Sequence, residues 1–133
     1  MRTHLEFQAE RFGGPGARPN QYSPEIFGAE LAEFLGSKFR EVGLSGTVGE
    51  EDWGWMVELK SEPFPLWLGC ASYGDDGWLV FIEPSQPTVR KWLKKIDTRD
   101  EVETVARQLE QILVNSGGAT NLNWWSDEDS GRK

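Results

Sequence analysis

Apolar and polar residues alternate along the chain with two different periods, and each period predicts one kind of element. Residues 3–9 alternate one by one, which predicts a strand with one face exposed to water. Residues 24–42 repeat apolar positions every three to four residues, which predicts a long helix. Ser23 is the expected N-cap of this helix, and Pro24 is its expected first residue.

Strand-like periods return between residues 46 and 83. The stretch 46–60 predicts two strands around the acidic turn Glu-Glu-Asp. The apolar runs "LWLGCASY" and "WLVFIEP" flank Gly-Asp-Asp-Gly at 74–77 and predict a hairpin in which Tyr73 pairs with Trp78. Both faces of this hairpin are largely apolar, which indicates a central position in the sheet.

A helical period returns in the last third of the chain. Residues 88–96 have apolar positions at i, i+3, i+4 and i+7, which predicts a short basic helix. The local charge over residues 90–99 is +4. Thr98 followed by Glu101 forms a capping box, and the apolar stripe that begins there predicts a second long helix ending at Gly117.

Together these elements give the order β-α-β-β-β-β-α-α. This order predicts an α+β fold, an antiparallel sheet of about five strands with two long helices and one short helix packed on one face. Residues 1–118 are expected to form a single domain, with a flexible Gly/Pro loop at 13–20. Residues 119–133 are expected to form a C-terminal tail whose last residues are disordered.

Composition narrows the possible partners and compartment. The chain has 133 residues and a net charge of −8, and this charge disfavours nucleic acid because it repels the phosphate backbone. No apolar signal segment and no run of about 18 apolar residues occurs, so we expect a cytoplasmic protein without a membrane partner. Secretion by a route without a cleavable signal stays open. Cys70 is the only cysteine, which excludes a disulfide framework and fits a reducing compartment.

Candidate catalytic residues are few. His4 is the only histidine and begins a strand, and Cys70 lies in an apolar run, so neither indicates nucleophilic catalysis. Carboxylates at 50–52 and 75–76, near tryptophans, could build an acid hydrolase or a calcium site, but neither has a specific spacing. We therefore expect no enzyme, no metal and no cofactor.

Two aromatic and acidic stretches are the predicted binding sites for a basic protein partner. Acidic side chains around an aromatic anchor steer a basic partner, while the indole supplies buried area. Trp53 can equally lie in the core, and the tail can dock on the sheet as an edge strand. The predicted partner-binding residues are Glu50, Glu51, Asp52, Trp53, Asp75, Asp76, Trp124 and Trp125. Seven tryptophans also allow a small-ligand or carbohydrate site in a tryptophan-lined cleft.

The size, the acidity and the run "EEDWGW" make the chain similar to small bacterial proteins of the immunity or inhibitor type. Such proteins neutralise a toxin by covering its active face, so the resemblance implies a protein-binding function. Type III secretion chaperones are similar in length and acidity, but their order begins with a helix, whereas a strand is predicted first here. The oligomeric state is not determined by the sequence, and a homodimer stays open.

Overall fold

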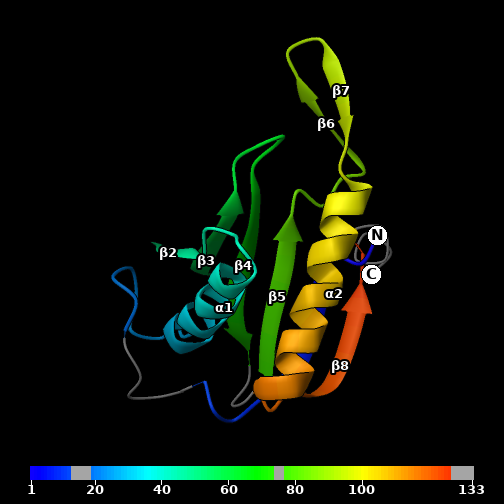
Figure 1. The fold of residues 1–133 in the computed structure, drawn as a ribbon. Coiled ribbons are helices and arrows are strands. Elements are labelled where there is room, and N and C mark those ends of the chain that lie inside the picture. Colours follow the sequence, from blue (N-terminus) through cyan, green and yellow to red (C-terminus); the bar gives the residue numbers. More distant parts are fainter. Residues whose placement is uncertain (13–18, 74–76, 127–133) are drawn as a thin grey trace.

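The computed structural model describes residues 1–12, 19–73 and 77–126. It contains a six-stranded sheet with the order β2-β3-β4-β5-β1-β8, in which all neighbouring strands are antiparallel, and a separate two-stranded sheet, β6-β7 (Figure 1). Two helices pack on the large sheet. The elements are β1 His4–Gln8, α1 Ala29–Glu41, β2 Thr47–Glu51, β3 Gly54–Lys60, β4 Leu66–Tyr73, β5 Gly77–Glu83, β6 Thr88–Lys91, β7 Lys94–Asp97, α2 Arg99–Ser116 and β8 Thr120–Trp125.

The predicted fold, with about five strands and three helices, is wrong. The described chain has eight strands and two helices and is α+β only in the broad sense. The expected short helix at 88–96 is the β6–β7 hairpin, which projects beyond the sheet at the top of Figure 1. Residues 120–125 of the expected tail form β8, an edge strand beside β1.

The core lies between the sheet and the two helices, both of which cover the same face (Figure 1). Side chains alternate across a strand, so every second residue faces this core. Burying a large apolar side chain stabilises the fold by about 1.5–3 kcal/mol. The buried sheet residues include Leu5, Phe7, Trp55, Val57, Leu59, Leu66, Leu68, Cys70, Trp78, Val80 and Ile82.

Helix α1 begins later than the sequence predicts, whereas α2 begins directly after Thr98 as predicted but without the predicted side-chain cap. Helix α1 starts at Ala29 rather than residue 24, because Ser23 closes a turn with the Ile26 amide and the chain then bends at Gly28. Gly28 has a φ of 137°, and a Cβ there would lie 3.1 Å from the Trp55 ring, which leaves little room for a larger residue. Before α2, the Thr98 hydroxyl donates to the Gln86 carbonyl at 2.5 Å instead of capping the helix.

The β4–β5 hairpin is shifted by one residue from the expected register. Tyr73 pairs with Gly77, Ser72 with Trp78 and Gly69 with Phe81. The turn residues 74–76 lie outside the described part of the chain. The Phe81 ring covers Gly69, where a Cβ would lie 2.1 Å from Phe81 Cζ, so this register depends on a glycine at position 69.

No helix within the described ranges combines the length and apolar character required to cross a membrane.

Candidate functional site

The face of the sheet opposite the helices is the candidate functional surface. Both α1 and α2 lie in front of the sheet in Figure 1, and none of the described helices covers its other face. We call this other side the open face. It carries the residues that alternate with the buried ones along each strand.

Five rings form a continuous row across the open face. Trp53 lies at the β2–β3 turn, and its ring centroid is 6.1 Å from that of Trp67 on β4 and 5.2 Å from that of Phe81 on β5. The Phe81 centroid is 5.8 Å from that of His4 on β1, which stacks on Trp125 of β8 at 4.0 Å. We call these five residues the aromatic strip.

The aromatic strip is accessible to a partner. Trp53 is 38% exposed, and the other four side chains are half-buried because they pack against one another rather than under a helix. Gly69 allows the Phe81 ring to lie flat over β4, which brings it against Trp53 and Trp67. An aromatic row on a face that none of the described helices covers is a feature of interaction surfaces.

Two carboxylates lie on the same face as the strip. Glu6 follows His4 by two residues and pairs with Leu79, and Glu58 pairs with Trp67. Neither carboxylate forms an ion pair with another residue of the described ranges. The open face therefore combines aromatic area with unneutralised negative charge.

The structure brings only some of the predicted site residues together. Glu50 accepts a hydrogen bond from the Gln21 amide at 2.8 Å, and the Glu51 carbonyl accepts one from the Asn20 side chain at 3.0 Å. These contacts fix the β2–β3 turn against the segment before α1. Asp52 is exposed at this turn, next to Trp53. The predicted residues Asp75 and Asp76 lie outside the described residues.

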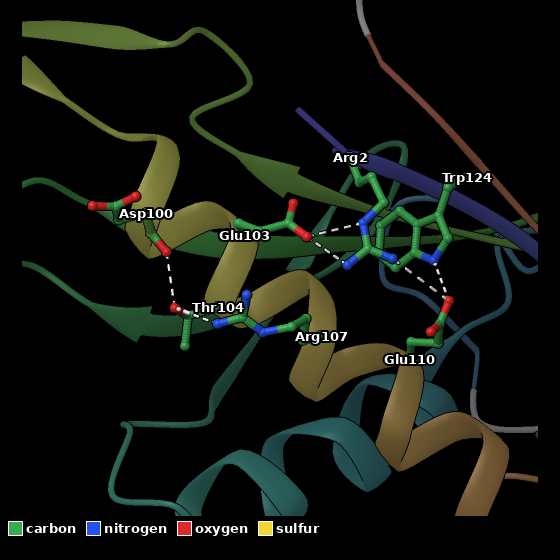
Figure 2. A network of polar contacts seen from close by, with 7 residues as sticks. All are labelled: Arg2, Asp100, Glu103, Thr104, Arg107, Glu110 and Trp124. Carbon is green, nitrogen blue, oxygen red and sulfur yellow. Dashed lines mark hydrogen bonds and ion pairs between the residues drawn. The ribbon is translucent and has the colours of Figure 1, made fainter.

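The two adjacent tryptophans of β8 point to opposite sides of the sheet. Trp125 joins the aromatic strip, whereas Trp124 packs on the helix side, where its Nε1 donates to Glu110 at 2.7 Å. The Arg2 guanidinium lies 5.2 Å from the Trp124 ring and donates to Glu103 at 2.5 Å (Figure 2). These contacts hold β8 against α2, so the predicted role of Trp124 in partner binding is not supported by its position.

The structure shows the surroundings of the candidate metal ligands and of Cys70 and His4 within the described residues. No group of three or more His, Cys, Asp or Glu side chains in these ranges could hold a metal ion. Burial raises the pKa of Cys70 to about 12, so its thiol stays protonated and unreactive. His4 Nδ1 lies 2.8 Å from the Thr3 hydroxyl, and its ring stacks on Trp125.

His4, Trp67 and Phe81 were not predicted as site residues. The signal for Trp67 and Phe81 was present in the sequence, since the two runs of the β4–β5 hairpin are apolar on both faces, whereas His4 joins them only through the pairing of β1 with β5. That pattern predicted a central hairpin, and β4 and β5 are central strands, but it did not indicate that one of the two apolar faces is the open one. No known protein family, curated protein or solved structure matches this chain. Function is therefore inferred from the surface alone.

Proposed function

We propose that the chain is a non-enzymatic protein-binding domain that receives its partner on the open face of the sheet. The aromatic strip is the observation that supports this function. Trp and Tyr side chains, with Arg, contribute most of the energy of protein interfaces, because a large ring buries much area at little cost in rotamer freedom. A broad aromatic face of this kind suits a protein surface.

The charge of the open face indicates a basic partner. Glu6 and Glu58 are not neutralised by other described residues, and Asp52 is exposed beside Trp53. The net charge of −8 adds a long-range attraction for a basic protein. Association is therefore expected to be fast at low ionic strength and to slow as salt screens these charges.

A protein partner fits the strip better than a carbohydrate does. A sugar ring binds by stacking on the free face of an aromatic ring. In the strip, His4 and Trp125 stack at an interplanar angle of 17°, and Phe81 packs against both Trp53 and Trp67. Because neighbouring rings cover one another, the strip presents edges and one broad apolar area rather than separate sugar platforms.

An immunity or inhibitor role is the biological setting that we propose for this binding. An acidic domain can neutralise a toxin by covering a basic active face, and the same charge keeps the domain soluble when it is free. We place this role in the cytoplasm, where the unpaired Cys70 would remain reduced.

Site-specific photo-crosslinking tests the proposed face in the cells that produce the protein. A photoreactive phenylalanine analogue replaces Trp53 in one variant and Gln111, which is exposed on α2, in a matched control. We expect position 53 to capture a protein with a basic surface and position 111 not to capture it. The captured amount should fall when cells are lysed and irradiated at higher salt.

The opposite result would remove the open face as the binding surface. Equal capture from both positions, or capture from position 111 alone, contradicts the proposal. Adding Glu6→Lys and Glu58→Lys to the position-53 variant gives a second measurement, because reversing these charges should abolish capture of a basic partner while leaving the aromatic strip intact.

A further inference from the structure

The β6–β7 hairpin carries a second unoccupied surface. Lys91 pairs with Lys94, so Trp92 and Leu93 form the two-residue turn between the strands. Trp92 is 92% exposed and Leu93 is 93% exposed, and the hairpin projects away from the body of the protein (Figure 1). Two large apolar side chains at the tip of a ribbon contribute nothing to the core.

The tip is poorly suited to its own turn. Trp92 has a φ of 61°, a left-handed conformation that glycine, asparagine or aspartate normally supplies in such turns. A bulky residue in this region is an outlier that costs stability. The fold therefore maintains Trp92 at a cost and receives no packing in return, which indicates a role in binding.

The strands of the hairpin also carry like charges opposite each other. Arg90 pairs with Lys95, and Lys91 pairs with Lys94, so two cross-strand pairs repel. Residues 88–97 carry four cations and one acid, which gives them a net charge of +3. Since the whole chain has a net charge of −8, the rest of the chain carries −11. The hairpin is thus a basic element on an acidic protein.

One side of the ribbon faces its own body and the other is free. Val89 and Ile96 pack against the core, and Lys91, on the same side, forms an ion pair with Glu62 at 2.7 Å. Arg90 and Lys95 alternate with these residues and lie on the other side, and neither pairs with a carboxylate of the described ranges. The free surface therefore carries Arg90, Lys95 and the Trp92–Leu93 tip, while Asp97, on the same side, is ion-paired with Arg99.

We propose that this free surface of the hairpin docks on the open face of a second copy of the chain. The inference rests on the proposed function, because it assigns an occupant to the same aromatic strip. The strip offers apolar area for Trp92 and Leu93, and the unneutralised Glu6 and Glu58 offer partners for Arg90 and Lys95. The hairpin thus supplies cations and the open face supplies carboxylates, and both supply apolar area.

Charge favours a second copy over other occupants. The hairpin carries cations, the open face carries carboxylates on β1 and β3, and one chain contains both surfaces, so a two-fold dimer would bury each of them twice. An anionic membrane would attract the basic hairpin but repel the rest of the chain, which carries a net charge of −11. In the dimer the strip is occupied, so self-association competes with a foreign partner.

Sedimentation velocity of the full chain, over a wide range of concentrations and at low and high salt, tests the docking. We expect a reversible dimer that dissociates as salt rises. Trp92→Asn combined with Leu93→Ser should weaken dimerisation by about a thousand-fold, because the two-fold dimer loses this contact twice and each lost hot spot is worth about thirty-fold. Asparagine tolerates the φ of Trp92, so the variant should keep its fold, as circular dichroism checks.

A charge-swap pair identifies the two docking surfaces. The variants Arg90→Glu with Lys95→Glu, and Glu6→Lys with Glu58→Lys, should each be monomeric alone. Mixed in equal amounts they should form a heterodimer, because the acidic hairpin then meets the basic face and the unchanged hairpin meets the unchanged face. Thermal melts of each variant show that the monomers are folded.

Several results would overturn the inference and leave the proposed function standing. A wild-type chain that stays monomeric at every concentration excludes the second copy, and if it also sediments with phosphatidylserine vesicles, the tip is a lipid contact instead. The inference is also overturned if the hairpin substitutions leave the dimerisation affinity unchanged. It is overturned equally if the mixture of charge-swapped variants stays monomeric. In each case cross-linking from position 53 to a basic protein still tests the open face independently.

Discussion

Cys70 lies in the middle of β4, where its backbone pairs with Trp55 on one side and Val80 on the other. All three side chains are fully buried, and burial raises the pKa of the thiol to about 12. A buried thiol surrounded by apolar groups acts as a small apolar residue rather than a nucleophile. Its position in an apolar run of the sequence was enough to predict this.

Chemical labelling and pH-dependent unfolding check the state of Cys70. At pH 8 the native chain should not react with a thiol reagent, whereas the chain unfolded in denaturant should react fully. The unfolded thiol loses its proton near its ordinary pKa of 9.0 and the native thiol only near 12, so the native state binds more protons between these values. The free energy of unfolding should therefore fall with rising pH, by at most about 1.4 kcal/mol per pH unit.

The matched control is Cys70→Ala, which removes the titrating group. The difference in unfolding free energy between the wild type and this variant should be constant below pH 9 and shrink above it. A constant difference up to pH 11 would show that the native thiol ionises normally and is not enclosed.

Trp53 and Trp55 show where residue-level prediction ends. The two indoles are separated only by Gly54, yet Trp55 is fully buried and Trp53 is 38% exposed in the aromatic strip. Gly54 allows this because the carbonyl oxygen of Cys70 would lie 2.2 Å from any Cβ at that position. This contact comes from β4, so alternation along the local sequence could not separate a core tryptophan from a surface one.

At the level of elements, the hairpin at 88–97 is the clearest failure of sequence pattern. Apolar residues at i, i+3, i+4 and i+7 fit one stripe of a helix. The same spacing is symmetric about its centre, so it also fits a hairpin in which Val89 pairs with Ile96 and Trp92 and Leu93 form the turn. No glycine or asparagine marks this turn, so the local sequence favoured the helix.

Helix α1 and the segment before β2 meet at two glycines. A Cβ on Gly36 would lie 2.5 Å from the Gly46 carbonyl oxygen, and one on Gly46 would lie 2.2 Å from the Gly36 carbonyl oxygen. The two backbones are therefore in direct contact. The helical period predicted a helix here, but the partner of Gly36 depends on the tertiary fold.

The contact reverses the usual effect of a glycine substitution. Gly→Ala in a helix normally stabilises by about 1 kcal/mol. Gly36→Ala should instead lower the free energy of unfolding by about 1–3 kcal/mol, because the added methyl group forces the backbones apart. Urea unfolding measures the change, with Ser37→Ala, at an exposed neighbouring position, as a control expected to be neutral or stabilising. A stabilised Gly36→Ala variant would contradict the close approach.

For the whole molecule, β8 completes the sheet at its β1 edge. It brings Trp124 against Glu110 and Arg2, and it supplies Trp125 to the aromatic strip. The sequence allowed either a docked or a free tail at this point. A tail without a clear period cannot show which edge it would join, because the order of strands is a property of the assembled sheet.

Removal of residues 119–133 should destabilise the entire domain. The free energy of unfolding should fall by about 3 kcal/mol or more, because the packing that Trp124 provides is removed and β1 becomes an exposed edge. Exposed edges pair between molecules, so light scattering on warming should also increase. A chain that ends after Ser126 keeps β8 and is the control. Equal stability of both truncations would show that β8 adds little to the sheet.

The position of β1 between β5 and β8 also sets the order of events during folding. His4 pairs with Phe81 on one side and with Trp125 on the other, so β1 gains its first strand neighbour only after β5 has been synthesised. Such distant pairings slow folding, because a long loop must close before they form. Until then the apolar side of β1 lacks its cover and can bind a chaperone or another unfolded chain.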